Sequence, residues 1–381
     1  MSGKVVVFGA GATGRGHVGL LAWQAGFEVV WVDRAPELVA ALQRAGHYRV
    51  RLYGARTQEI EVSGFRVYHS EQRQAIAAEI ADADLVLTAV FDHNLPDVAV
   101  TLALAAQACR RAGRHRPLNC IACENMVDSS STLGRHVYAL LGPEDAAYAH
   151  EYWGFPDSMI SRVVPRPEPD PLQIVTENYN EWTARAEAFK GEKPATLTAL
   201  ELVHNQSARL ERKLFIHNGG HAICGYVGFQ RGHRYIHEAV ADPVVAEHVL
   251  GALEELGAVV QRRHSFSPES IAAYQQELVR RGSIAELKDA ILRVVRDPIR
   301  KLARHERLVA PALLAEEYGL ARRWIVAGIV AALRYRHPAD AQSLALGEQL
   351  ALHGLDTVLE HVCGIQPDSA LAAELRQVYR I

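Results

Sequence analysis

A glycine-rich turn between two strand-like runs constrains the fold of this chain more than any other feature. The apolar run VVVF (5–8) is followed by GAGATG (9–14), then by a helical pattern, and then by the run FEVVWVD, which ends at Asp33. A strand, a glycine turn, a helix and a second strand within about thirty residues are typical of a dinucleotide-binding unit. An ordinary glycine turn in an α/β protein is the alternative.

Each glycine of this turn has a physical task. Gly9 allows the tight turn, Gly11 lets a pyrophosphate approach the backbone, and Gly14 lets helix and strand pack closely. The N-terminus of the helix then offers free N–H groups to the phosphates. The predicted cofactor contacts are Phe8, Gly9, Ala10, Gly11, Ala12, Thr13, Gly14, Asp33, Arg34, Ala89, Val90 and Asn125.

The acid at the end of the second strand favours NAD as the cofactor. Asp33 would accept hydrogen bonds from the adenosine ribose hydroxyls, and its charge would repel the 2′-phosphate of NADP. Arg34 follows it directly and weakens that preference, because an arginine there could accommodate a phosphate.

Two further apolar runs, 85–90 (LVLTAV) and 118–123 (LNCIAC), flank a segment rich in Ala and Leu that reads as a helix. Together they predict a doubly wound parallel sheet, in which ligands bind at the carboxyl ends of the strands. Ala89 and Val90 end one strand, and Glu124 and Asn125 end the next. We therefore expect Asn125 to face the nicotinamide and the substrate, with a capping turn residue as the alternative.

The pattern changes near residue 190. The polar stretch KGEKPATLT (190–198) reads as a linker, and the chain beyond it is mostly helical in pattern, as at 244–263, 268–281 and 322–336. The sequence predicts an α/β protein in which an N-terminal Rossmann-type doubly wound domain (1–190) is followed by a mainly α-helical substrate domain (191–381).

Composition excludes several classes of protein. The 41 Lys plus Arg against 44 Asp plus Glu leave a formal charge of −3, which does not suggest a general nucleic-acid binder. No apolar stretch is long enough for a membrane span, so we expect a cytoplasmic protein. The 5 cysteines are too few and odd in number for a disulfide framework. Cys120 and Cys123 read as buried small side chains on opposite faces of a strand, rather than as a redox or metal pair.

Lysine is rare in this chain, and one lysine lies in an unusual setting. Only six of the cations are Lys, and Lys213 lies within ERKLFIHNGGH (211–221). Arg stays protonated in proteins, whereas a buried Lys can become neutral and act as a general base. Asn218 could then hydrogen-bond an alkoxide. On a helix Lys213, Asn218 and His221 converge only if the helix is regular, and Gly219 and Gly220 make that uncertain or leave room for a ligand.

Two other interpretations of this segment remain open. One is a surface helix that carries a few polar residues. Alternatively His217 and His221, spaced i,i+4, are compatible with zinc, but no third ligand is evident in the sequence.

Four segments resemble the polyol-specific long-chain dehydrogenases, and the similarity runs over nearly the whole chain. They are GAGATGRG (9–16), IACENM (121–126), ERKLFIHNGGHA (211–222) and DPIRKLARHERLVAPA (297–312). The resemblance implies a metal-independent, commonly monomeric enzyme that converts mannitol 1-phosphate and NAD to fructose 6-phosphate and NADH. It implies Lys213 as the general base, Asn218 and Asn125 as the pair that stabilises the alkoxide, and His221 as a contact to a substrate hydroxyl.

A phosphorylated substrate needs cations, and one short stretch supplies them. Arg300, Arg304 and Arg307 would share a face of a helix, with Lys301 beside them, and could hold the phosphate of a polyol phosphate or sugar phosphate. A solvated basic face is the alternative. Relatives that act on unphosphorylated polyols or hexuronates carry similar motifs, and a non-catalytic NAD sensor is a further possibility.

Overall fold

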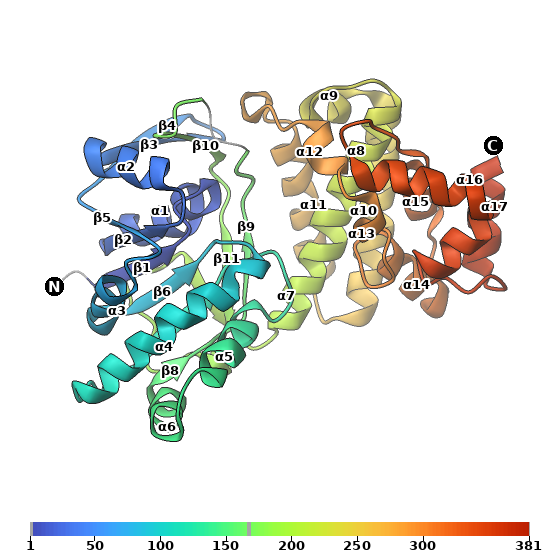
Figure 1. The fold of residues 1–381 in the computed structure, drawn as a ribbon. Helices are drawn as coiled ribbons and strands as arrows, with labels where there is room; N and C mark the ends of the chain where they lie inside the picture. The colour runs from blue at the N-terminus through green and yellow to red at the C-terminus, as the bar shows by residue number, and fades with distance from the viewer. Residues whose placement is uncertain (1–2, 166–168, 381) are drawn as a thin grey trace. The chain divides into compact units, whose positions relative to one another are not determined.

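The structure, a computed structural model, describes residues 3–165 and 169–380, which form two compact units, Met1–Arg209 and Leu210–Ile381 (Figure 1). The predicted boundary between the two domains lies after residue 190. In the structure β12 (Leu200–Val203) pairs in parallel with β11 (Glu181–Arg185), so the chain belongs to the first unit until after β12.

The first unit is built on a six-stranded sheet with the order β5-β2-β1-β6-β7-β8. All of its pairings are parallel. The strands are β1 (Lys4–Phe8), β2 (Glu28–Asp33), β5 (Arg66–His69), β6 (Leu85–Thr88), β7 (Leu118–Ala122) and β8 (Trp153–Gly154). The strand order reverses between β1 and β6, which is the position where ligands bind in such sheets. The predicted doubly wound parallel sheet is confirmed.

Both faces of this sheet are buried. Along β1, Val5 and Val7 belong to one hydrophobic core, and Val6 and Phe8 belong to another. Successive side chains of a strand point to opposite faces, so an unbroken apolar run is what a strand between two helical layers requires. The helical elements of this unit are the π-helix η1 (Gly14–Val18), α1 (Gly19–Gln24), α2 (Pro36–Ala45), α3 (Arg73–Asp82), the 3₁₀ turn η2 (Asp92–Asn94), α4 (Leu95–Arg111), α5 (Ser129–Ala139), α6 (Pro143–Tyr152) and the 3₁₀ turn η3 (Ala186–Ala188).

Two small sheets of the first unit are absent from the sequence-based prediction. One has the order β10-β3-β4, with β3 (His47–Tyr53), β4 (Gln58–Ser63) and β10 (Gln173–Glu177). The other has the order β12-β11-β9, with β9 at Ser158–Ser161. Strand β12 lies within the range predicted to be mainly helical, because a strand this short depends on its partner β11 and leaves little local signal.

The described elements of the second unit are helical, as predicted. They are α7 (Gln206–Arg212), which begins just before the boundary, the π-helix η4 (Lys213–Gly219), α8 (Gly220–Gln230), α9 (Ile236–Ala241), α10 (Pro243–Arg263), α11 (Pro268–Gly282), the 3₁₀ turn η5 (Ala285–Leu287), α12 (Ile291–Val295), α13 (Pro298–Lys301), α14 (Val309–Tyr318), α15 (Arg323–Arg334), α16 (Ala341–His361) and α17 (Ala370–Arg380).

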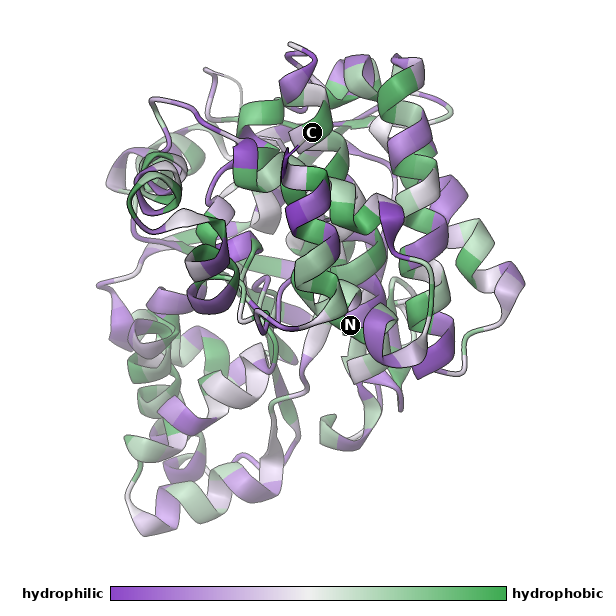
Figure 2. Ribbon diagram, turned by 90° about the vertical axis from the view of Figure 1, so that its right-hand side faces the viewer, coloured by the Kyte–Doolittle hydropathy of each residue, from purple (hydrophilic) through white to green (hydrophobic). Residues whose placement is uncertain are grey.

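Helix α8 lies at the centre of the second unit. Its residues from Ala222 to Gly228 are buried without interruption, and it packs against α9, α10, α12 and α15. A helix that is buried all round needs apolar residues all round, whereas the surrounding helices alternate hydrophobic and hydrophilic residues (Figure 2). No described helix is both long and apolar enough to cross a membrane.

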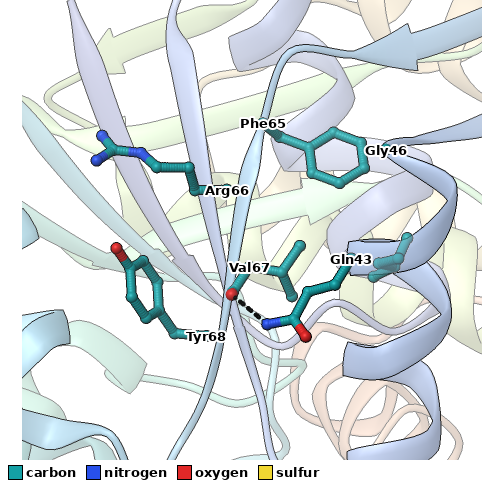
Figure 3. A pocket seen from close by; sticks show the side chains of 7 residues that line it. Gln43, Gly46, Phe65, Arg66, Val67 and Tyr68 are labelled. Atoms are coloured by element: carbon teal, nitrogen blue, oxygen red, sulfur yellow. Dashed lines mark hydrogen bonds between the residues drawn. The ribbon is translucent and has the colours of Figure 1, made fainter.

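A hollow of about 280 Å³ lies between α2 and the edge strand β5, lined by Leu42, Gln43, Gly46, Phe65, Arg66, Val67 and Tyr68 (Figure 3). Gln43 closes one side by donating to the Val67 carbonyl at 2.9 Å. Phe65 and Arg66 lie at the amino end of β5. The hollow is therefore near the amino ends of the parallel strands, whereas the glycine turn follows the carboxyl end of β1.

Candidate active site

The glycine turn connects β1 to the first helix, and its glycines differ in what surrounds them. Gly9 has a φ of 94°, and a Cβ there would lie 2.3 Å from the Ala89 carbonyl oxygen. A Cβ on Gly14 would lie 1.9 Å from the Gly9 carbonyl oxygen, whereas a Cβ on Gly11 would meet nothing within 4 Å. The fold itself therefore requires Gly9 and Gly14, and the space over Gly11 is open to a ligand.

Asp33 is tied to this turn through the backbone. Its Oδ2 accepts from the Ala10 N–H at 2.7 Å and its Oδ1 accepts from the Ala35 N–H at 2.9 Å. These two bonds fix the carboxylate beside the glycine turn, where a nucleotide ribose would meet it. The next side chain, Arg34, is exposed and donates to Asn94 Oδ1 at 3.0 Å. An open glycine backbone, the start of a helix and a fixed acid together fit the binding of a dinucleotide.

The buried side chain of Arg15 holds the glycine turn in place, and Arg15 is missing from the predicted site residues. It is 1% exposed, donates through Nε to the Ala10 carbonyl at 2.5 Å, and donates through a terminal nitrogen to the Pro171 carbonyl at 2.6 Å. It also lies over the ring of Tyr48, 5.3 Å from the centroid. Arg15 thereby links the turn to the segment that leads into β10.

A buried acid ties together the strand ends beside the turn. Glu124 follows β7 and accepts from the Thr88 hydroxyl at 2.7 Å and from the Val90 N–H at 2.9 Å. Burial raises the pKa of Glu124, although these hydrogen bonds act in the opposite direction. Asn125 is exposed at the same edge of the sheet. Glu124 is missing from the predicted site residues, although an acid directly after the strand run LNCIAC could have marked it.

The cysteines of this region are structural. Cys120 belongs to one core of the sheet and Cys123 to the other, which confirms that they lie on opposite faces. Burial raises the pKa of both thiols above the ordinary cysteine range.

In the second unit, Lys213 begins a π-helix rather than a regular α-helix. Residues Lys213–Gly219 form this segment between α7 and α8. A π-helix closes its hydrogen bonds between residues five apart. The spacing of five between Lys213 and Asn218 therefore places these two residues one turn apart, which a regular α-helix would not do. Lys213 and Asn218 can therefore converge without the regular α-helix that was expected to be necessary.

Gly219 and Gly220 serve helix packing. A Cβ on Gly219 would lie 2.8 Å from the Arg307 carbonyl oxygen, and a Cβ on Gly220 would lie 2.6 Å from Leu253 Cδ2. The room that they leave is taken by the second unit itself, so the hypothesis that a ligand presses against these glycines is not supported.

His221 is one turn further along, on α8, and an acid fixes it. Its Nε2 lies 3.1 Å from Asp289 Oδ2, and the other carboxylate oxygen accepts from Arg293 at 2.7 Å. Asp289 is 7% exposed. Burial acts to raise the pKa of Asp289, but His221 and Arg293 outweigh it and hold the pKa below the ordinary value. Asp289 and Arg293 lie more than sixty residues from His221 along the chain, and no local sequence pattern marks them as its partners.

His217 has a different partner. It is 7% exposed, and its Nδ1 lies 3.3 Å from a terminal nitrogen of Arg281, which is 4% exposed. The rings of His217 and His221 are 5.9 Å apart. With respect to the zinc alternative, the described residues contain no group of three or more His, Cys, Asp or Glu placed to hold a metal ion. A guanidinium at His217 Nδ1 also opposes a dication there.

The cationic stretch 300–307 is not helical throughout, so the predicted common helix face is wrong. Helix α13 ends at Lys301, and turns lead from there to α14. Arg304 makes a tertiary contact by donating to the Gly364 carbonyl, whereas Arg307 donates to its neighbour Glu306 at 2.9 Å. Arg300 lies 3.4 Å from the same acid.

Lys301 is the most buried cation of this stretch, with 5% exposure, and it donates to the Arg296 carbonyl. Burial, together with the charges of Arg300 and Arg307, lowers the pKa of Lys301 to about 7.

Comparison with known proteins extends this picture. Residues 3–197 match the mannitol dehydrogenase Rossmann domain, and residues 207–367 match the mannitol dehydrogenase C-terminal domain. These matches, with the fold and the glycine turn, define a dinucleotide-binding oxidoreductase. More narrowly, the chain belongs to the mannitol dehydrogenase family.

Two solved structures share this fold along the entire chain. Mannitol 2-dehydrogenase of Pseudomonas fluorescens, in a ternary complex with NAD and D-mannitol, aligns with a TM-score of 0.78 at 18% identity and covers 100% of this chain and 92% of its own. A D-sorbitol dehydrogenase in substrate-free form aligns with a TM-score of 0.84 at 15% identity and with the same coverages.

Proposed function

We propose that the protein oxidises mannitol 1-phosphate at C5 to fructose 6-phosphate, as a mannitol-1-phosphate 5-dehydrogenase, with Lys213 as the general base. The observation that carries the proposal is the π-helical segment, because its spacing puts Lys213, the proposed proton acceptor, one turn from the amide of Asn218. His221, oriented by Asp289, follows on the next turn.

NAD supplies the hydride acceptor. Neutral Lys213 takes the proton of the reacting hydroxyl as the hydride leaves the same carbon. Asn218 and Asn125 donate hydrogen bonds to the oxygen as its negative charge builds, and His221 binds a neighbouring hydroxyl. In the reverse direction, protonated Lys213 donates to the ketone.

For the phosphate we propose Arg300, Lys301, Arg304 and Arg307. Lys301 suits a dianion, since a nearby negative charge raises the pKa of a buried amine and favours its charged form. Arg307→Gln should lower kcat/KM for mannitol 1-phosphate by about tenfold to a hundredfold while leaving any activity on mannitol unchanged, consistent with a lost charge-assisted contact. The matched control is Arg111→Gln, because Arg111 is an exposed arginine of the first unit that bonds only its own helix, at the Gln107 carbonyl.

The second candidate is an oxidoreductase that acts on an unphosphorylated polyol or a hexuronate. It is supported by the family match and by the likeness of the fold to an enzyme solved with D-mannitol. A panel of polyols, polyol phosphates and hexuronates, followed by NADH absorbance, separates the two candidates. A preference for mannitol rather than for its phosphate would refute the first. We further propose that the protein is a cytoplasmic monomer, for which sedimentation at working concentration tests the oligomeric state.

The role of Lys213 is tested by Lys213→Ala. Loss of a general base should lower kcat by about 10²–10⁴-fold while NADH binding is retained. Lys193→Ala is the control, since Lys193 lies in the first unit and only bonds the Leu197 carbonyl. Added primary amines should restore part of the lost rate. Near-normal turnover of Lys213→Ala would remove Lys213 from the mechanism, and loss of NADH binding would mean that its role is structural.

A further inference from the structure

The catalytic scheme uses His221 of α8 but gives no role to His217, which lies in the π-helix η4. His217 is more than nine-tenths buried, a setting in which an imidazole is costly unless its polar atoms are used. One turn of a π-helix takes between four and five residues. His217 and Asn218, four and five positions after Lys213, therefore both lie about one turn from it.

The partner of His217 determines which ring nitrogen carries the proton. An arginine side chain can only donate, so the 3.3 Å contact with Arg281 makes Nδ1 of His217 the acceptor. A neutral imidazole with Nδ1 as acceptor carries its hydrogen on Nε2. Among the described residues no group accepts from this Nε2–H.

The surroundings keep the ring neutral. Burial, followed by the charges of Arg281, His221, Lys213 and Arg293, lowers the pKa of His217 well below the ordinary value. These groups come from α11, α8, η4 itself and α12. The buried acid of α10, Glu255, is held by the Trp324 and Ile325 N–H groups.

His221 has the opposite arrangement. Its Nε2 faces the carboxylate of Asp289, which can accept a hydrogen bond from that nitrogen. The site thus holds two imidazoles 5.9 Å apart, of which one is fixed by a cation and the other by an anion. Because their hydrogen-bond partners differ in charge, the two rings can serve different tasks.

We propose that His217 is a second hydroxyl-binding residue of the polyol site, a neutral donor through Nε2–H, and that Arg281 is the positioning residue that fixes this tautomer. The inference rests on the proposed function for the nature of the ligand. It assigns His217 a hydrogen bond that does not change with pH across the working range. It also excludes His217 as a competitor of Lys213 for the substrate proton.

The kinetic test uses variants that separate the donor from the bulk of the side chain. His217→Gln keeps an N–H near the position of Nε2, whereas His217→Leu fills the space without one. His217→Leu should lower kcat/KM for the best polyol substrate of the panel by about tenfold to a hundredfold, because a hydroxyl site loses its donor. His217→Gln should stay within about fivefold of the wild type, and NADH affinity should not change in either. Equal losses in both variants would overturn the role of the donor.

The role of Arg281 is tested by the pH profile. In Arg281→Met the fixed tautomer is released and the pKa of His217 rises, so the acidic limb of kcat/KM should move to higher pH, and this shift should disappear in Arg281→Met/His217→Gln. A profile that is unchanged in Arg281→Met would show that Arg281 does not act through His217.

Nitrogen-15 spectra of the histidine rings test the tautomer without any substrate, so this test remains valid even if no polyol is oxidised and the proposed function fails. The signals of His217 are assigned by their absence in His217→Gln. The Nε2–H pattern should persist from pH 8 down to about pH 5, well below the ordinary histidine pKa. An Nδ1–H pattern, or an imidazolium at neutral pH, would overturn the proposal.

Discussion

Two alanine substitutions in the glycine turn, Gly11→Ala and Gly14→Ala, should have opposite consequences. In Gly14→Ala the new methyl group would lie 1.9 Å from the Gly9 carbonyl oxygen, so backbone atoms must move by about 1 Å. Overpacking costs roughly 1–3 kcal/mol, and the rigid partner here points to the upper end. The midpoint of thermal unfolding should fall by roughly 6–12 °C, at about 2–4 °C per kcal/mol for a unit of this size.

In Gly11→Ala the methyl group meets nothing within 4 Å, so the thermal midpoint of the free protein should stay within about 1 °C. The cost appears when NADH binds, because the methyl group occupies the space in which the pyrophosphate approaches the backbone. Loss of about two hydrogen bonds to a charged group, at roughly 1.5–3 kcal/mol each, weakens binding at least about a hundredfold.

Differential scanning fluorimetry with and without NADH, and a fluorescence titration of NADH, measure both quantities. Gly142→Ala is the matched control, since Gly142 also has open space around it and lies at the start of α6. The reasoning is refuted if Gly11→Ala binds NADH as tightly as the control, or if Gly14→Ala unfolds at the temperature of the wild type.

Two further predictions concern groups with shifted pKa values. The pKa of Lys301 is depressed in the folded protein to about 7, so this amine favours folding above the pKa of the unfolded chain and loses that contribution as pH falls to about 7. Lys301→Met should therefore raise the midpoint of thermal unfolding more at pH 6.5 than at pH 9.5, and an equal change at both values would contradict the shifted pKa. The thiols of Cys120 and Cys123 should not react with a thiol reagent at pH 8 until the protein unfolds, since burial raises the pKa of both; stoichiometric labelling of the native protein would contradict their burial.

The sequence predicted the central sheet because its strands carry a local signal. VVVF and FEVVWVD are buried on both faces, so their apolar runs are unbroken and the turn between them is marked by glycine. The long helices were equally readable, and 244–263 and 268–281 fall within α10 and α11 as observed. In each of these elements the residues that determine the structure are close neighbours in the chain.

The elements that were missed depend on distant partners. β12 needs β11, and the stretch 300–307 leaves the helix because its side chains bond to groups such as the Gly364 carbonyl. The same holds for the candidate site. Residue type and spacing pointed to Lys213 and His221, but Asp289 and Arg281 reach this face from other elements and carry no local signal. The π-helical geometry at Lys213 likewise depends on how the helix packs.

The late strands of the first unit have a consequence for biosynthesis. Strand β10 pairs with β3, although about 120 residues separate them in the chain, and Trp182 and Leu200 complete the same core as Val5. As the chain leaves the ribosome, the glycine turn emerges early, but the layer that supports it is finished only after β12 has appeared. Until then its apolar surface stays open to chaperones and to other nascent chains, so a ribosome that stalls before residue 200 should release a product that aggregates rather than a functional nucleotide-binding unit.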